Sequence, residues 1–115
     1  MKNRTNDRER LGHILKAVDF ILKHTNNKTE NEFYRDDLLK YAILKQIEII
    51  GEAANYLSND IIEKYEKLEW RDIINARHIY VHHYDRVDFT MVWEIAIKNI
   101  PLLKTAIADI LNEME

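Results

Sequence analysis

Glycine and proline are scarce in this chain, and their scarcity constrains the fold more than any other feature. Among 115 residues there are 2 glycines and 1 proline. The turns that connect β-strands depend heavily on these two residue types. A protein built mainly from β-sheet is therefore disfavoured, and the sequence predicts helices joined by few, short loops.

The composition bounds the size and class of the protein. Hydrophobic residues make up 46% and charged residues 32% of the chain, which is typical of a globular protein, and the length predicts a single domain over residues 1–115. Cysteine is absent, so disulfides, thiolate metal sites and cysteine nucleophiles are excluded. The net charge of −3 indicates that any contact with nucleic acid is local rather than spread over a basic surface.

The beginning of the chain predicts where the protein resides. Residues 1–10 are polar and lack the apolar core of a signal peptide. No apolar run approaches the length that spans a bilayer. We therefore expect a cytoplasmic protein without a membrane-spanning segment.

Apolar residues recur at helical spacing in most of the chain, and this predicts an all-α antiparallel bundle of four main helices plus a short helix. We expect the main helices within 11–25, 38–58, 69–84 and 88–115, the short helix within 58–70, and a loop over 26–37. Pro101 should kink or restart the last helix. The candidate caps are Asp36 or Asp37, Ser58 or Asn59, and Asp88.

The segment 38–58 has apolar residues on two faces. The second face holds Leu38, Ala42, Ile49 and Ala53, which indicates a central helix or a subunit interface. Gly51 lies in this helix and costs about 1 kcal/mol relative to alanine. That cost is tolerable if another backbone packs closely there.

The stretch RHIYVHHYD, residues 77–85, crowds one arginine, three histidines and two tyrosines into nine residues. On a helix that starts near Trp70, Arg77 falls on the apolar stripe, where an arginine is seldom found without a partner or a ligand. Two interpretations remain open. Arg77 is paired with a carboxylate such as Glu52, or it binds an anion in a polar pocket.

The position of His82 limits how such a pocket can form. On an ideal helix, His82 points about 140° away from Arg77, whereas Tyr84 lies within about 20° of it. A straight helix would therefore not aim Arg77 and His82 at one point. Either the helix ends or distorts near His82, or a twofold dimer brings two copies of the segment around one cleft.

A metal site is a rival interpretation of the same histidines. His78 and His82 are four residues apart, the spacing of helical metal-ligand pairs. However, no glutamate lies between them as in HExxH, and no third ligand is evident. A simpler alternative is that His78 and His83 are exposed.

The arrangement R-x4-H-x-Y, formed here by Arg77, His82 and Tyr84, resembles the R-x(4–6)-H-x-Y signature of HepT-like toxins in the HEPN superfamily. The segments IIGEAA, W–R, VD…VW and NIPLL occur in the same order and also resemble that family. The residue after the arginine departs from the usual asparagine or aspartate, since it is His78. A histidine can also donate a hydrogen bond at this position.

The resemblance implies a HEPN-like homodimer whose motifs face a shared cleft, and a ribonuclease toxin that needs neither metal nor cofactor. Arg77 would hold the RNA phosphate. His82 would carry protons during attack by the 2′-hydroxyl, leaving a 2′,3′-cyclic phosphate and a 5′-hydroxyl end. The second proton carrier would be His82 of the other subunit, His78 or His83.

The resemblance also implies a partner, an MNT-type nucleotidyltransferase that acts as the antitoxin of a type VII-like pair. This enzyme would adenylylate Tyr84, and the added anionic group would occupy the phosphate site beside Arg77. Two alternatives remain: a non-catalytic subunit that binds nucleotide or substrate for a nucleotidyltransferase, and a purely structural helical dimer.

Overall fold

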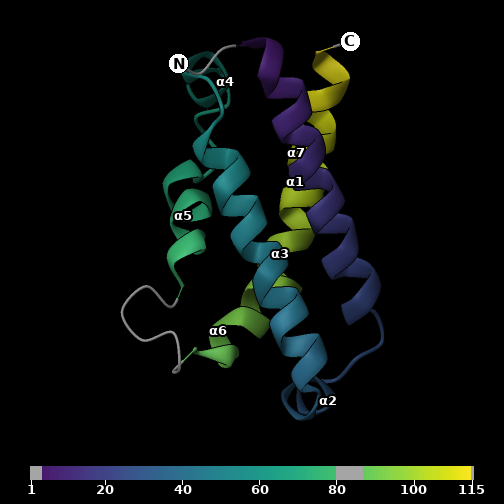
Figure 1. Cartoon of the computed structure of the whole chain (residues 1–115). Helices are drawn as coiled ribbons and strands as arrows, with labels where there is room; N and C mark the ends of the chain where they lie inside the picture. The colour runs from purple at the N-terminus through teal and green to yellow at the C-terminus, as the bar shows by residue number, and fades with distance from the viewer. Residues whose placement is uncertain (1–3, 80–86, 115) are drawn as a thin grey trace.

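The computed structural model describes residues 4–79 and 87–114, and every regular element in this part of the chain is a helix. This confirms the predicted all-α class (Figure 1). The elements are α1 (Arg4–Thr25), α2 (Glu30–Arg35), α3 (Asp37–Asn55), α4 (Asn59–Lys64), α5 (Trp70–Asn75), the 3₁₀ helix η1 (Ala76–His78), α6 (Phe89–Glu94), the π-helix η2 (Ile95–Asn99) and α7 (Ile100–Glu113).

The three long helices form the bundle. α1 packs against both α3 and α7 and runs antiparallel to each of them (Figure 1). α5 and η1 pack against α3, on the side away from α1 (Figure 1). α1, α3 and α7 supply most of the buried side chains, including Leu11, Ile14, Val18, Ile21, Ile43, Ile47, Ile50, Leu103, Ile107 and Ile110.

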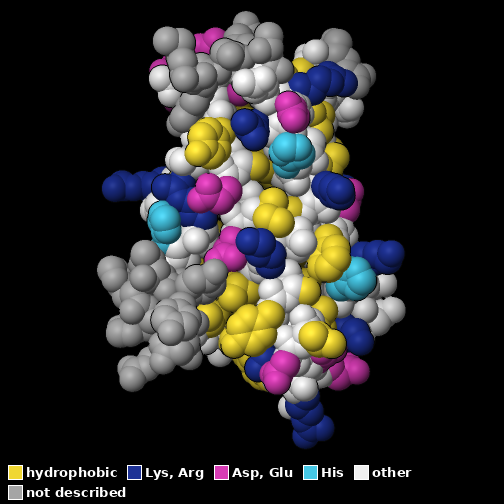
Figure 2. All heavy atoms as spheres, in the orientation of Figure 1, with side chains coloured by type: hydrophobic (Ala, Val, Ile, Leu, Met, Phe, Trp, Pro, Cys, Tyr) yellow, Lys and Arg dark blue, Asp and Glu magenta, His cyan; other side chains and the backbone are white. Residues whose placement is uncertain are grey.

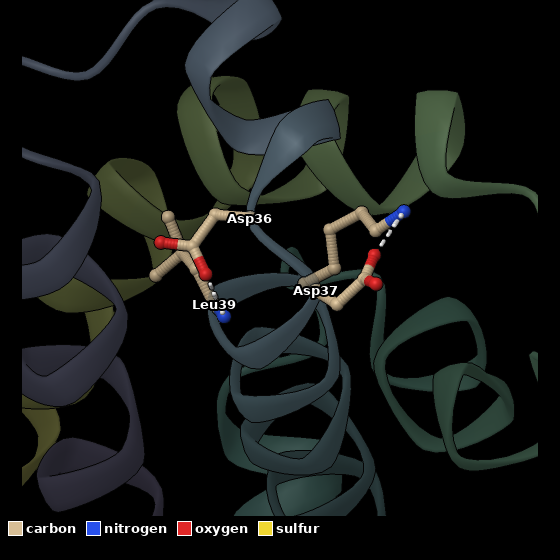
Figure 3. A network of polar contacts seen from close by, with 4 residues as sticks. Asp36, Asp37 and Leu39 are labelled. Atoms are coloured by element: carbon tan, nitrogen blue, oxygen red, sulfur yellow. Dashed lines mark hydrogen bonds and ion pairs between the residues drawn. The ribbon is translucent and has the colours of Figure 1, made fainter.

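The predicted helix caps are confirmed where an acceptor side chain precedes an apolar run. Asp36 is the N-cap of α3, and its side chain accepts a hydrogen bond from the backbone N–H of Leu39 at 3.0 Å (Figure 3). The next residue, Asp37, forms an ion pair with Lys40 at 3.2 Å. Ser58 caps α4 and Asp88 caps α6 in the same way. Each cap satisfies backbone N–H groups that have no partner within the helix.

Two departures from the prediction lie in the first third of the chain. Residues 26–37 are not only a loop, because α2 lies within them. Thr29 and Glu32 form a reciprocal capping box that starts this helix, and Phe33 is fully buried, with its ring 5.0 Å from that of Trp93. In addition, α1 begins at Arg4 rather than near Leu11.

The C-terminal segment changes its helical winding near its proline, where a kink or restart was predicted. α6 ends at Glu94, a π-helix covers Ile95–Asn99, and Pro101 lies in the first turn of α7. Proline is tolerated at this position because the first N–H groups of a helix lack intrahelical acceptors in any case. Within residues 4–79 and 87–114, the structure contains no helix that is both long and apolar enough to cross a membrane.

Candidate active site

Arg77 lies in a 3₁₀ turn rather than in a continuous α-helix. α5 ends at Asn75, and Ala76–His78 form η1. The prediction of one α-helix over 69–84 is therefore wrong for Ala76–His78, and its part over 80–84 lies outside the described residues. Because a 3₁₀ helix has about 3 residues per turn, the spacing of an ideal α-helix does not apply within Ala76–His78.

Gly51 brings the backbone of α3 against this turn. A Cβ atom at Gly51 would lie 2.8 Å from the backbone nitrogen of Arg77, 2.9 Å from the Cβ of Arg77 and 3.0 Å from the carbonyl oxygen of Ile74. Real Cβ atoms essentially never approach other atoms as closely as the two distances to Arg77. The predicted close approach of a second backbone at Gly51 is confirmed, and the backbone that approaches is that of Arg77.

The Nε of Arg77 has two neighbours. It lies 3.7 Å from Oε1 of Glu52, which confirms the predicted pairing, and it donates a hydrogen bond to Nε2 of His78 at 2.9 Å. The side chain of Arg77 is 21% exposed and that of Glu52 is 58% exposed. An ion pair with so much solvent around its carboxylate contributes little stability, so Glu52 only partly compensates the guanidinium.

The Nη1 of Arg77 is buried and has no hydrogen-bond partner among the described residues. A buried donor without an acceptor is unfavourable by about 1–3 kcal/mol. An anion such as a phosphate oxygen would supply the acceptor and a favourable charge. The two interpretations of Arg77 are therefore compatible, since its Nε is paired while its Nη1 lacks a partner.

The structure brings together only some of the predicted site residues. Arg77 and His78 are in contact, and His78 is exposed. His82, His83 and Tyr84 lie outside the described residues, so their convergence on Arg77 stays a prediction. The same holds for the His78–His82 metal pair. Among residues 4–79 and 87–114, no three histidine, aspartate or glutamate side chains are grouped as metal ligands.

The sequence identifies His78 as a residue that can donate a hydrogen bond after the arginine. In the structure its Nε2 accepts a hydrogen bond from Arg77, and its other ring nitrogen remains able to donate. No spacing in the sequence signals this contact, because it depends on the tight turn of η1.

A cavity of about 370 Å³ lies elsewhere, between the loop after α4 and the end of α7, and its lining includes Tyr65, Asp109 and Glu113 rather than Arg77.

Comparison with known proteins identifies relatives of the whole bundle. Residues 14–110 match the family described as "Ribonuclease HepT-like". The chain is 37% identical over 105 residues to a "Gamma-glutamylcyclotransferase and putative RNase" of Methanocaldococcus jannaschii. The matched region covers 91% of this chain but only 47% of the length of that protein. A "Putative RNase" of the same organism is 32% identical over 91 residues, covering 79% of this chain and 84% of the relative.

A further relative carries the family's own name. The "Probable ribonuclease HepT" of Thermococcus cleftensis is 30% identical over 94 residues, covering 82% of this chain and 86% of that protein. No solved structure matches the chain.

Proposed function

Because this chain belongs to the HepT-like ribonuclease family, we propose that it is a cytoplasmic endoribonuclease and that Arg77 and His82 carry its chemistry. Residues 1–115 act as one HEPN-like domain in this proposal. The observation that supports it best is the state of Arg77. Its Nε has partners, while its buried Nη1 has none among the described residues.

The reaction needs only proton transfer and stabilisation of charge on phosphorus. A base takes the proton of the RNA 2′-hydroxyl, the 2′-oxygen attacks the adjacent phosphorus, and the bond from phosphorus to the 5′-oxygen breaks. The leaving oxygen receives a proton, which gives a 2′,3′-cyclic phosphate and a 5′-hydroxyl end. His82 is the proton carrier, since a histidine side chain changes charge near neutral pH. Arg77 stabilises the anionic transition state.

The regulation that we propose involves a homodimer and a nucleotidyltransferase partner, as in a type VII-like toxin–antitoxin pair. An MNT-type enzyme transfers AMP from ATP to the hydroxyl of Tyr84 and releases pyrophosphate. The new phosphodiester is an anion close in sequence to Arg77 and competes with the RNA phosphate for it. Such a modification silences the nuclease without unfolding it.

Cleavage of a fluorescent single-stranded RNA of mixed sequence tests the enzymatic part. The purified chain should cut this RNA in the presence of EDTA, and Arg77→Ala and His82→Ala should each lower kcat by about 100- to 1,000-fold. His13→Ala is the matched control, because His13 is an exposed histidine on α1. Circular dichroism must show unchanged helicity in every variant. Loss of cleavage on chelation, with recovery on adding zinc, would instead support the His78–His82 metal site.

Expression in bacteria separates the two classes of function. A nuclease toxin should stop growth, and His82→Ala should restore it. A chain that binds ATP through Arg77 but leaves both growth and RNA intact would be the alternative, a non-catalytic substrate-binding subunit of a nucleotidyltransferase.

Mass spectrometry of the chain co-expressed with its nucleotidyltransferase tests the modification. The added AMP should lie on Tyr84 and disappear in Tyr84→Phe, with growth arrest returning. Tyr80 is the control acceptor, four residues earlier. An adduct on Tyr80 alone would contradict the assignment to Tyr84.

A further inference from the structure

The hydrogen bond between Arg77 and His78 defines which ring nitrogen of the neutral imidazole carries the proton. The Nε of an arginine always carries a proton and can only donate. It lies 2.9 Å from Nε2 of His78, so that nitrogen must be the acceptor. A neutral histidine has one donor and one acceptor nitrogen, and the proton of His78 is therefore on Nδ1.

His78 is also the closer of the two groups that face the Nε of Arg77. The carboxylate oxygen of Glu52 lies 3.7 Å away, beyond hydrogen-bond distance, and its side chain is 58% exposed. A guanidinium is planar and rigid. Once its Nε–H is bound to His78, the plane of the group is restricted, and the direction of the two Nη atoms is restricted with it.

We propose that His78 is a positioning residue for Arg77 in RNA cleavage, an inference that rests on the proposed function above. The imidazole accepts the Nε–H and restricts the guanidinium to the orientation in which it binds the RNA phosphate. In this role His78 does not exchange protons with RNA, because its acceptor nitrogen is occupied by Arg77. The proposal therefore separates His78 from His82, the proton carrier.

Three variants distinguish a positioning role from proton transfer in the full-length chain. His78→Gln retains an acceptor oxygen on a side chain of similar reach but cannot titrate, so we expect kcat within about threefold of the native value, since each tenfold loss corresponds to about 1.4 kcal/mol. His78→Ala removes the acceptor, and we expect kcat to fall by about 10- to 100-fold through misplacement of Arg77. His13→Ala is the control for loss of an exposed histidine. If His78→Gln is as inactive as His78→Ala, or if His78→Ala is fully active, the positioning role is wrong.

A second measurement does not depend on activity. In ¹⁵N-labelled protein, the ring nitrogens of His78 should show a proton on Nδ1 and none on Nε2 at a pH where the ring is neutral, and Arg77→Ala should abolish this preference. Cleavage of RNA by a protein whose His78 carries its proton on Nε2 would refute the positioning role alone. A native chain that shows the expected tautomer but cuts no RNA would refute the ribonuclease proposal and leave the Arg77–His78 contact standing.

Discussion

Asp7 is a fully buried carboxylate that links the start of α1 to the start of α4. Its Oδ1 accepts the backbone N–H of Ser58 at 2.8 Å, and its Oδ2 accepts the hydroxyl of Ser58 at 2.5 Å. The same hydroxyl oxygen accepts the N–H of Ile61 at 3.4 Å, which caps α4. One carboxylate thereby satisfies two buried donors and holds a helix cap in place.

Truncation of Asp7 should therefore destabilise the fold. We expect Asp7→Ala to lower the free energy of unfolding by about 2–3 kcal/mol, because it leaves the N–H and the hydroxyl of Ser58 buried without their acceptor. Asp7→Asn keeps the shape and one acceptor oxygen, and should cost less. Urea denaturation measures both. Asp19→Ala is the control on the same helix, since Asp19 pairs with Lys104 at the surface and should cost at most about 1 kcal/mol. Equal losses at Asp7 and Asp19 would contradict the role of Asp7.

The two glycines should respond oppositely to alanine. At Gly12, an added Cβ meets nothing within 4 Å, so Gly12→Ala should raise the free energy of unfolding by about 0.5–1 kcal/mol through helix propensity. At Gly51, the Cβ meets the backbone of Arg77, which cannot rotate away. We expect Gly51→Ala to lose about 1–3 kcal/mol despite its better propensity, and to weaken RNA cleavage by displacing Arg77. If both variants are stabilised alike in urea, the close approach at Gly51 is wrong.

The structural role of a residue could be predicted from the sequence where that residue breaks the helical or apolar pattern around it. Where a residue fits its surroundings, nothing in the sequence indicated its role. Gly51 is a poor helix former inside a helix, which predicted the close approach of another backbone. Arg77 is a charged residue on an apolar stripe, which predicted its pairing with a carboxylate such as Glu52. Asp7 lies in a polar segment where one more carboxylate carries no signal. The acceptor role of His78 depends on local backbone geometry that residue spacing does not encode.

At the scale of helices, the same contrast explains the boundaries. Asp36, Ser58 and Asp88 each stand before an apolar run, and their capping role was predictable. α2 has six residues, too few for a helical period to show, although Thr29 and Glu32 have the spacing of a capping box. The apolar spacing after Trp70 favoured a continuous helix. The change to 3₁₀ geometry coincides with close packing against Gly51, a tertiary contact.

The capping box of α2 should give a pH-dependent contribution to stability. The pKa of Glu32 is lowered from its ordinary value of 4.5, chiefly because its carboxylate accepts the backbone N–H of Thr29. A lowered pKa in the folded state means that the charged carboxylate stabilises the fold at neutral pH, and that this contribution is lost as the pH falls through the lowered pKa. Glu32→Gln should therefore be less stable than the native chain at pH 7, with the difference shrinking below pH 4.5.

Urea denaturation between pH 7 and pH 3 measures this difference. Thr29→Ala is the matched control. It retains the backbone N–H, the largest cause of the lowered pKa of Glu32, but removes the side chain of Thr29, the second cause, so its stability should keep only part of the pH dependence that Glu32→Gln loses. A difference between the native chain and Glu32→Gln that stays constant over this range would contradict the assignment.

At the scale of the whole molecule, the apolar second face of α3 is only partly covered. On this face Ala53 is buried, Ala42 and Ile49 are half-buried, and Leu38 is 87% exposed. Tyr41, three residues after Leu38, is 56% exposed. Figure 2 shows hydrophobic side chains gathered over the lower part of α3 on this face of the molecule.

The helical class and the family followed from the sequence. The homodimer stays a prediction, and light scattering at micromolar concentration should show twice the mass of one chain. A strict monomer would contradict it.

Such a dimer also predicts how two inactive chains behave together. If Arg77 of one subunit acts with His82 of the other, an Arg77→Ala chain and a His82→Ala chain can together form one intact site. Random pairing of equal amounts makes half of the dimers mixed, each with one working site of two, so about a quarter of the native activity should return. The chains must be unfolded and refolded together to exchange, with each variant refolded alone as the control. Native mass spectrometry confirms the mixed dimer. If mixed dimers form but RNA cleavage does not recover, a site that combines Arg77 of one subunit with a single His82 of the other is contradicted.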